Sequence, residues 1–434
     1  MINIKSSINK WGEIMRKRVI SIGLALVMAT GITTIAFSKE QMKSSSNLQG
    51  KEASVKDEKI DNYKNIRIAG KDRFETANKI ADEFCKTNRE LEIKGGIYSD
   101  TKINKIDTVI LVNQFNQYDA LCATPLSRAY NAPILLTHDD NLPQSTKNQI
   151  KKMNIKKVII VGGDGVVKSN IEKQLNKDCK INKENIERYG GKNKYETSFI
   201  VAQNIEKKLS EDTGSKLRSM FLFDGDQWQQ AMIAAPIAAQ NYVPILLVPK
   251  TIEPIKDLKI KEWCSDVGLN EINCRYYGNR SLGEMSDNIL KALIPMKTQC
   301  DNFEIDGGNW NSTYVNQIGI LDDLWENEYL DLSDKLVLAN GNNFEDSLVV
   351  GPLVAKLQSY IILCEPYVHG TIEEEYEYEL KKTMEQGNVL EEDIKDINKI
   401  INLTTKDLCK NVKKTYYVGN EMNLPYDAKH MIED

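Results

Sequence analysis

The chain has 434 residues, of which 41% are hydrophobic and 27% are charged, as in an ordinary globular protein. This composition excludes a disordered or collagen-like chain, and the length allows roughly two to four domains. The formal net charge of -5 argues against general nucleic-acid binding, which needs a basic surface. The 3 histidines severely limit any mechanism that needs several imidazoles.

The first 38 residues have the three parts of a signal peptide. Basic residues precede an uncharged run from Val19 to Phe37, and the small residues Ala36 and Ser38 stand on either side of Phe37. A run of this length could also just span a bilayer, but its Thr and Gly residues favour cleavage. We therefore predict an exported protein that meets the membrane only through this segment. The mature chain would hold 52 basic and 61 acidic residues.

The eight cysteines include no C-x-x-C pair, and all of them follow the signal segment. An even number permits disulfides in an exported protein. Cys122 and Cys364 lie in apolar runs and are expected to be small core residues. The sequence alone leaves open whether Cys264 and Cys274 form a disulfide.

Residues 39–65 are polar and predict a flexible linker, after which the sequence repeats itself three times. We place the repeats at 66–184, 185–300 and 301–434, the third with a helical insertion at about 366–410. The first two repeats open with matching, ungapped segments, Arg67 to Thr76 and Arg188 to Thr197. The opening of the third, Ile305 to Thr313, is weaker and one residue shorter.

The middle of each repeat keeps the same spacing. An Asp-Ala-Leu-like motif precedes a proline by six residues, and an aliphatic triplet begins nine residues after that proline. The motifs begin at Asp119, Gln230 and Asp346. Each repeat then closes with an apolar run and a glycine, namely Gly162, Gly278 and Gly419. Short apolar runs between turn residues predict buried strands, and helical patterns such as 76–84 and 120–130 lie between them. This alternation predicts an α/β fold with parallel sheets.

Together these motifs resemble the type-2 cell-wall-binding repeat, the anchor module of wall and S-layer proteins in Gram-positive bacteria. The resemblance covers residues 66–434. It implies three tandem doubly wound domains, Rossmann- or flavodoxin-like, in a pseudo-threefold arrangement. It also implies non-covalent binding to an anionic, teichoic-acid-like secondary wall polymer near the aliphatic triplets. The triplets here are Ile134, Leu135, Leu136, Ile245, Leu246, Leu247, Ile361, Ile362 and Leu363.

The triplets also suit core strands, whose carboxyl ends rather than side chains would then meet a ligand. An anionic polymer is best held by cations and by backbone N–H groups at helix starts. The opening motifs supply such cations: Arg67, Lys71, Arg73, Arg188, Lys192 and Lys194. The same residues could instead pair with Asp72, Glu75 and Glu196 to brace a helix start. The third opening motif has lost its cations, so we expect it to bind anions poorly.

Asp119 and Asp346 suit a helix cap or a hydrogen-bonding site, because Gln230 at the same position excludes a shared catalytic carboxylate. The segment Val161 to Val166 is glycine-rich but lacks the spacing of a phosphate loop, so it predicts a tight turn.

Two other functions compete with wall anchoring as interpretations of the sequence. A wall hydrolase or amidase would need clustered His and acidic ligands or an activated nucleophile, and the sequence has no H-x-x-x-H or G-x-S-x-G motif. Proteins with such repeats can nevertheless be associated with amidases. A nucleotide or small-molecule binder is compatible with the fold, but phosphate-loop chemistry is missing. We therefore predict a secreted, non-catalytic wall protein without metal or cofactor, whose partners are the polymer and S-layer or other wall proteins.

Overall fold

The computed structural model describes residues 64–87, 106–226, 228–270, 274–277, 284–295, 327–341, 348–364 and 411–419, with single positions between 317 and 325. These residues lie within one compact unit of the chain. The signal segment, most of the predicted linker, the third opening motif, Asp346 and the predicted insertion lie outside the described residues.

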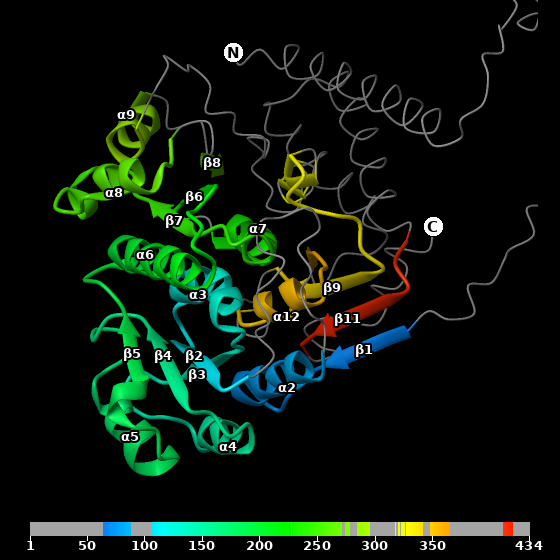
Figure 1. Ribbon diagram of the computed structural model, residues 1–434. Helices are drawn as coiled ribbons and strands as arrows, with labels where there is room; N and C mark the ends of the chain where they lie inside the picture. Colours follow the sequence, from blue (N-terminus) through cyan, green and yellow to red (C-terminus); the bar gives the residue numbers. More distant parts are fainter. Residues whose placement is uncertain are drawn as a thin grey trace, which may run out of the picture. The chain divides into compact units, whose positions relative to one another are not determined.

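The described strands form three sheets, one for each repeat (Figure 1). The first has the order β3 (Ile134–Thr137), β2 (Thr108–Asn113), β4 (Lys157–Val161) and β5 (Ile186–Tyr189). The second has the order β7 (Ile245–Val248), β6 (Met220–Asp224) and β8 (Cys274–Tyr277). The third has the order β1 (Lys64–Ile68), β11 (Lys414–Val418), β9 (Lys335–Asn340) and β10 (Ile361–Cys364). Every pairing among these strands is parallel, which confirms the predicted α/β class.

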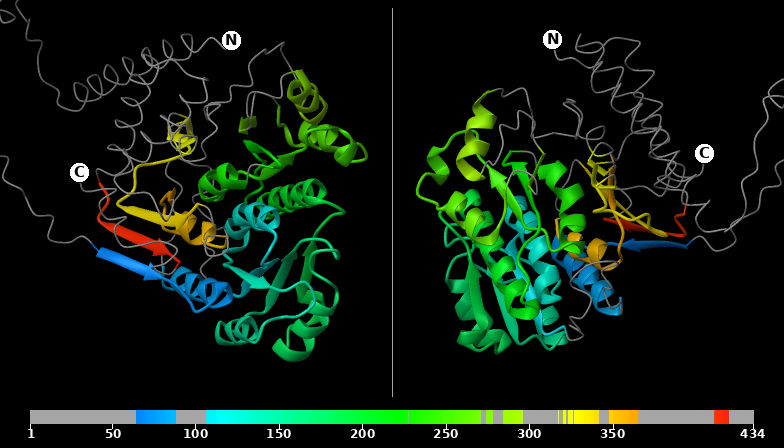
Figure 2. Two further views of the ribbon diagram at one scale, coloured as in Figure 1. Left: turned by 180° about the vertical axis from the view of Figure 1, so that it is seen from behind. Right: turned by 45° about the horizontal axis from the view of Figure 1, so that its top comes forward.

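Helices alternate with these strands, as predicted (Figure 2). Those of the first repeat are α2 (Arg73–Lys86), α3 (Gln117–Tyr130), α4 (Gln144–Lys152) and α5 (Asn170–Cys179). Those of the second are α6 (Lys194–Thr213), α7 (Trp228–Gln240), α8 (Ile260–Val267) and α9 (Glu284–Leu293), and α12 (Gly351–Lys356) belongs to the third. Two short 3-10 helices cover Lys183–Asn185 and Glu253–Ile255. Within the described part of the chain, no helix combines the length and the apolarity that a membrane crossing requires.

Helices α3 and α7 contain the Asp-Ala-Leu-like motif of their repeats and α12 follows it, and each of these helices contacts the other two. All three are almost entirely buried, which fits their small and apolar residues. Mutual packing of equivalent helices is what the predicted pseudo-threefold arrangement requires. The three helices therefore form a shared core for the repeats.

Strands β2, β4 and β6 are buried and almost entirely apolar, as in a parallel sheet covered on both faces, whereas the edge strands β1 and β5 are only partly buried. Cys122 and Cys364 are each 1% exposed, which confirms them as core residues. No disulfide joins any of the six described cysteines, so Cys264 and Cys274 are not linked to each other by a disulfide.

The first strand of a repeat joins the sheet of another repeat. Strand β5, in the second opening motif, pairs with β4 of the first repeat, and Tyr189 lies opposite Val161. Strand β1, in the first opening motif, pairs in the same way with β11 of the third, and Ile68 lies opposite Val418. It begins at Lys64, inside the predicted linker. The repeats therefore divide the sequence differently from the way the sheets divide the fold.

Candidate functional site

Each sheet has one point where the chain changes direction across it. In the first sheet the chain passes from β2 to β3 on one side and then to β4 on the other side of β2. Strands β6 and β8, and strands β9 and β11, stand in the same relation. Ligands of doubly wound sheets bind outside the carboxyl ends of the strands at such switch points. The three switch points are therefore the candidate sites.

At the first switch point, the β2–α3 turn, defined here as residues 114–118 and so including the first two residues of α3, presents an aromatic ring to solvent. Phe115 is 64% exposed, although the strand before it is buried. Its backbone N–H donates to Oδ1 of Asn113 at 2.8 Å, and Nδ2 of Asn113 donates to the Val166 carbonyl at 2.7 Å. Asn113 thus ties the turn to the loop that follows β4.

The opening motif supplies a cation to this ring. The Arg73 guanidinium carbon lies 5.0 Å from the centre of the Phe115 ring, a cation–π contact. Next to it, the rings of Phe74 and His138 meet edge to face at 4.8 Å, and Nδ1 of His138 lies 2.6 Å from Nε2 of Gln114. The sequence predicted Arg73 as a polymer-binding cation, and the structure places it at the switch point beside an exposed aromatic ring.

Asp119 lies beneath the same turn and is 2% exposed. Asn116, the N-cap of α3, accepts the Asp119 N–H at 3.1 Å and donates its amide to Oδ2 of Asp119 at 2.7 Å. Burial raises the pKa of the Asp119 carboxyl to about 7, because the charged form loses its hydration. Its role is local hydrogen bonding at the helix start, one of the two roles that the sequence suggested.

The second switch point carries ion pairs where the first carries a ring. Nζ of Lys194 lies 3.1 Å from Oδ1 of Asp226, and Nζ of Lys250 lies 2.8 Å from Oδ2. The hydrogen bonds from Lys250 and Lys194 hold the pKa of Asp226 below its usual range. Lys194 also donates to the Gly225 carbonyl and lies 3.9 Å from the centre of the Tyr118 ring in the first repeat.

The two opening arginines bond to the neighbouring strand of their own sheet rather than extend into solvent. Arg188 donates to the carbonyls of Gly162 at 3.0 Å and Val167 at 2.6 Å and pairs with Glu172 at 2.7 Å. Arg67 donates to the carbonyl of Gly419, the equivalent closing glycine of the third repeat, at 2.8 Å. The repeated contact indicates that this position mainly stabilises the junction between repeats.

The helix starts are capped by their own motif. Asp72 accepts the Glu75 N–H at 2.8 Å, and Glu75 accepts the Lys71 N–H at 3.1 Å, a reciprocal pattern like a capping box. Asn193 and Glu196 repeat it at α6. The carboxylates therefore brace the helix start through the backbone, and these backbone N–H groups are already bonded. The side chains of Lys71 and Lys192 are exposed, and neither has an ion-pair partner among the described residues.

The aliphatic triplets form β3, β7 and β10, as the core-strand interpretation predicts. None of their side chains is more than 2% exposed: Ile134, Leu135, Leu136, Ile245, Leu246, Leu247, Ile361, Ile362 and Leu363. A ligand at these strands would meet their carboxyl ends and the loops beyond them. A polymer-binding role for the triplets stays a prediction from the resemblance.

The closing and opening glycines allow two backbones to cross. A Cβ on Gly190 would lie 2.2 Å from both the carbonyl carbon and the carbonyl oxygen of Gly162. Gly162 itself has a φ of +129°. The segment beyond it is the tight turn that the sequence predicts, closed by a hydrogen bond from Val166 N–H to the Gly163 carbonyl at 2.9 Å.

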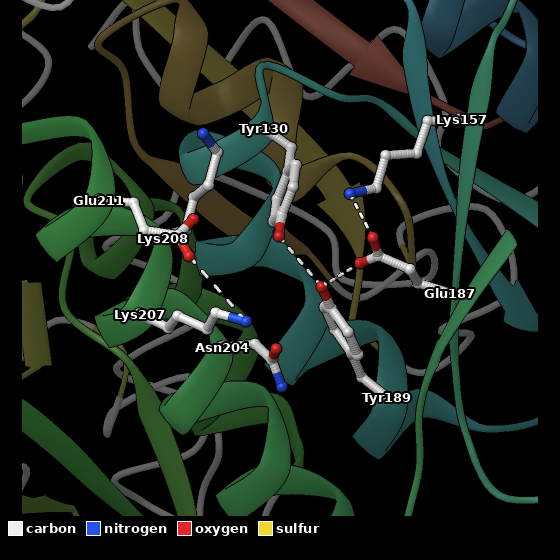
Figure 3. A pocket seen from close by; sticks show the side chains of 8 residues that line it. All are labelled: Tyr130, Lys157, Glu187, Tyr189, Asn204, Lys207, Lys208 and Glu211. Carbon is white, nitrogen blue, oxygen red and sulfur yellow. Dashed lines mark hydrogen bonds and ion pairs between the residues drawn. The ribbon is translucent and has the colours of Figure 1, made fainter. Parts of the chain in front are cut away.

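A polar cavity of about 190 Å³ lies between β5, α3 and α6, away from the switch points (Figure 3). Its centre is a chain of hydrogen bonds in which the Tyr130 and Tyr189 hydroxyls lie 3.0 Å apart and Tyr189 donates to Glu187. Nζ of Lys157 pairs with Glu187 at 2.6 Å. Burial and the Glu187 contact raise the pKa of Tyr189, which keeps it protonated. The cavity is a hydrogen-bonded joint between the first two repeats.

Sequence reasoning missed three residues at the switch points: Phe115, Tyr118 and Lys250. The available signal was a pair of aromatic residues in a short turn of amides, where a simple turn would be polar throughout. Lys250 follows the second triplet closely, but only the fold brings it to Asp226.

Comparison with known proteins supports the same class. A family model described as cell wall binding domain 2 matches residues 67–172 and 188–272. The model thus matches segments of the first two repeats, which confirms the resemblance of their motifs. The Bacillus subtilis protein named amidase enhancer is 26% identical over 68% of this chain, and the N-acetylmuramoyl-L-alanine amidase LytC of the same organism is 28% identical over 68%.

The solved structure of Cwp6 from Clostridium difficile covers 86% of this chain with a TM-score of 0.61 and 20% identity, which shows a shared fold. The chain spans 34% of the amidase enhancer, 49% of LytC and 48% of the Cwp6 chain. The comparisons therefore support association with the cell wall and concern only part of each relative.

Proposed function

We propose that this is a secreted, non-catalytic protein that binds the cell wall non-covalently through an anionic secondary polymer. The observation that carries this proposal is the match of the first two repeats to a cell wall binding domain. The arrangement of the site supports it, because each of these repeats brings an opening-motif cation, Arg73 or Lys194, to a switch point. Weak sites on one chain would bind a repeating polymer with avidity.

The charge of the chain sets the form of this binding. The mature chain is acidic, so an anionic polymer must meet local groups of cations such as Lys71 with Arg73 and Lys192 with Lys194. Contacts between exposed charges are screened over about 8 Å at physiological salt. We therefore expect salt to weaken wall binding; binding that did not change with salt would contradict the electrostatic part of the proposal.

Sedimentation with isolated walls tests the proposal directly. The mature chain is mixed with walls before and after mild acid has removed the secondary polymer, and the bound fraction is measured. We expect binding to intact walls and its loss from stripped walls. Equal binding to both would identify peptidoglycan as the ligand, and no binding to intact walls would refute the proposal.

A second candidate is a protein that acts with a wall amidase. It is favoured by the similarity to the amidase enhancer and to LytC. The test measures the rate at which an amidase clears a wall suspension with and without this chain. An increased rate that persists on polymer-stripped walls would favour this function over anchoring.

A further inference from the structure

We propose that the β2–α3 turn of the first repeat is a sugar-binding contact, in which a sugar ring of the polymer packs on Phe115. In this arrangement Arg73, which lies over the Phe115 ring, and Lys194, which lies over the Tyr118 ring, neutralise negative groups of the polymer. This inference rests on the proposed function and specifies its ligand as a glycan that carries anionic groups. It assigns the contact to a turn rather than to the aliphatic triplets.

The turn holds Phe115 out in the solvent. At 64% exposure it is the most exposed of the large hydrophobic residues in the described chain; Ile252 and Leu332 are 45% and 38% exposed. Two hydrogen bonds of Asn113 fix the backbone on which the ring stands. An apolar ring kept in water by a buried support favours an apolar ligand face, such as the C–H face of a sugar.

Arg73 gives the ring a charged neighbour. Its guanidinium carbon lies 5.0 Å from the ring centre and so covers one face, and the high exposure of Phe115 leaves ring surface for a ligand. An arginine in this position can bind a phosphate or carboxylate through two parallel hydrogen bonds. A sugar on Phe115 would therefore have a cation beside it for its anionic substituent.

A second cation and a second ring stand at the other end of the turn. Nζ of Lys194 lies 3.9 Å from the centre of the Tyr118 ring, although Lys194 belongs to the second repeat. Burial alone would lower the pKa of Lys194, but the hydrogen bond to Asp226 and neighbouring groups raise it, so the ammonium stays charged. The turn thus contacts the equivalent cations of two repeats, Arg73 through Phe115 and Lys194 through Tyr118.

The turn itself carries no charge, since its residues are Gln114, Phe115, Asn116, Gln117 and Tyr118. Gln114 and Asn116 are engaged with His138 and Asp119, whereas Gln117 is partly exposed and offers an amide to ligand hydroxyls. The amides and rings of the turn suit the uncharged sugar rings of a glycan. The two neighbouring cations, Arg73 and Lys194, suit negative groups that are separated along it. A phosphate chain without sugars has no apolar face that could pack on the Phe115 ring.

The test compares variants in the wall sedimentation assay at low salt and at high salt. We expect Phe115→Ala to lower the affinity for intact walls about tenfold at both salt concentrations, because ring stacking is not screened. Phe115→Trp should retain binding. Arg73→Gln should weaken binding at low salt and have much less effect at high salt. Leu332→Ala is the matched control, because it removes another exposed apolar side chain and should leave binding unchanged.

The outcomes separate this inference from the proposed function. If the wild-type chain binds walls only while the polymer is present and Phe115→Ala binds equally well, the turn is not the contact and the anchoring function stands. If the effect of Phe115→Ala vanishes at high salt, the ring does not stack on a sugar. If the wild-type chain binds no walls, both the proposed anchoring function and the sugar-binding contact are refuted. Circular dichroism of each variant checks that the fold is retained.

Discussion

The first and second repeats place different side chains at equivalent positions of their switch points. Arg73 lies over the Phe115 ring in the first, whereas Lys194 and Asp226 form an ion pair in the second. The buried carboxyl of Asp119 is replaced by the neutral Gln230. The two sites therefore share a backbone but differ in charge and in exposed aromatic surface.

The contacts that support the backbone do not differ in this way. Both helix starts have the same cap, and an opening arginine reaches a closing glycine in each of two junctions. Repeated contacts of this kind identify the scaffold, while the positions that differ identify the surface on which ligand preference depends. A single repeat could not have separated the two classes of residue.

The largest effect is expected where the scaffold is tightest. Gly190→Ala places a Cβ 2.2 Å from the backbone of Gly162, which neither backbone can accommodate without moving. We expect a loss of more than about 3 kcal/mol in the free energy of unfolding, measured by urea denaturation.

Gly165→Ala is the control, because its added Cβ meets nothing within 4 Å although it lies in the same junction. Its effect should stay within about 1 kcal/mol. Equal losses in the two variants would show that the crossing of backbones is not what holds the first and second repeats together.

An intermediate effect is expected from Asp119, the buried charge that the second repeat lacks. The folded-state pKa of about 7 lies above the unfolded value near 4, so the folded chain binds the proton more tightly. The contribution of Asp119 to stability is therefore most favourable at acid pH and is lost as the pH rises from about 4 to 7. We expect Asp119→Asn to raise the free energy of unfolding at pH 8 by about 2–4 kcal/mol.

The same variant should show little gain near pH 4, where the wild-type carboxyl is protonated in the folded state. Urea denaturation at pH 4 and at pH 8 measures the free energy of unfolding under the two conditions. Gln230→Glu introduces the acid into the second repeat and should produce the opposite change. A pH-independent gain in Asp119→Asn would mean that packing, not charge, determines the difference.

Much of the fold could be predicted from the sequence because three copies of one pattern are present. The strands at 108–113, 220–224 and 335–340 are short apolar runs, and their length and boundaries favour a buried strand over a helix. The exchange of β1 and β5 between repeats could not be predicted, since the pairing partner of a strand depends on contacts far along the chain.

The candidate site was less predictable than the fold. The opening motif indicated Arg73 and Lys194, but charge alone could not separate them from Arg67 and Arg188, which the structure engages at closing glycines. That distinction depends on hydrogen bonds over large sequence separations. Phe115 was missed because the identity of an aromatic residue in a sequence does not reveal whether its side chain is buried or exposed.

The smallest effect is expected at Asp226, where one substitution removes the charge that distinguishes the second switch point from the first. Its carboxylate pairs with Lys194 at 3.1 Å and Lys250 at 2.8 Å, so it competes with an anionic ligand for both ammonium groups. Asp226→Asn keeps the shape and removes the charge. We expect wall affinity to rise about threefold at low salt and to match the wild type at high salt, because these groups are partly exposed. Asp226→Phe, which copies the first repeat, should raise affinity at both salt concentrations. Weaker binding by Asp226→Asn would show instead that Asp226 positions the lysines, so that the second switch point depends on the pair itself.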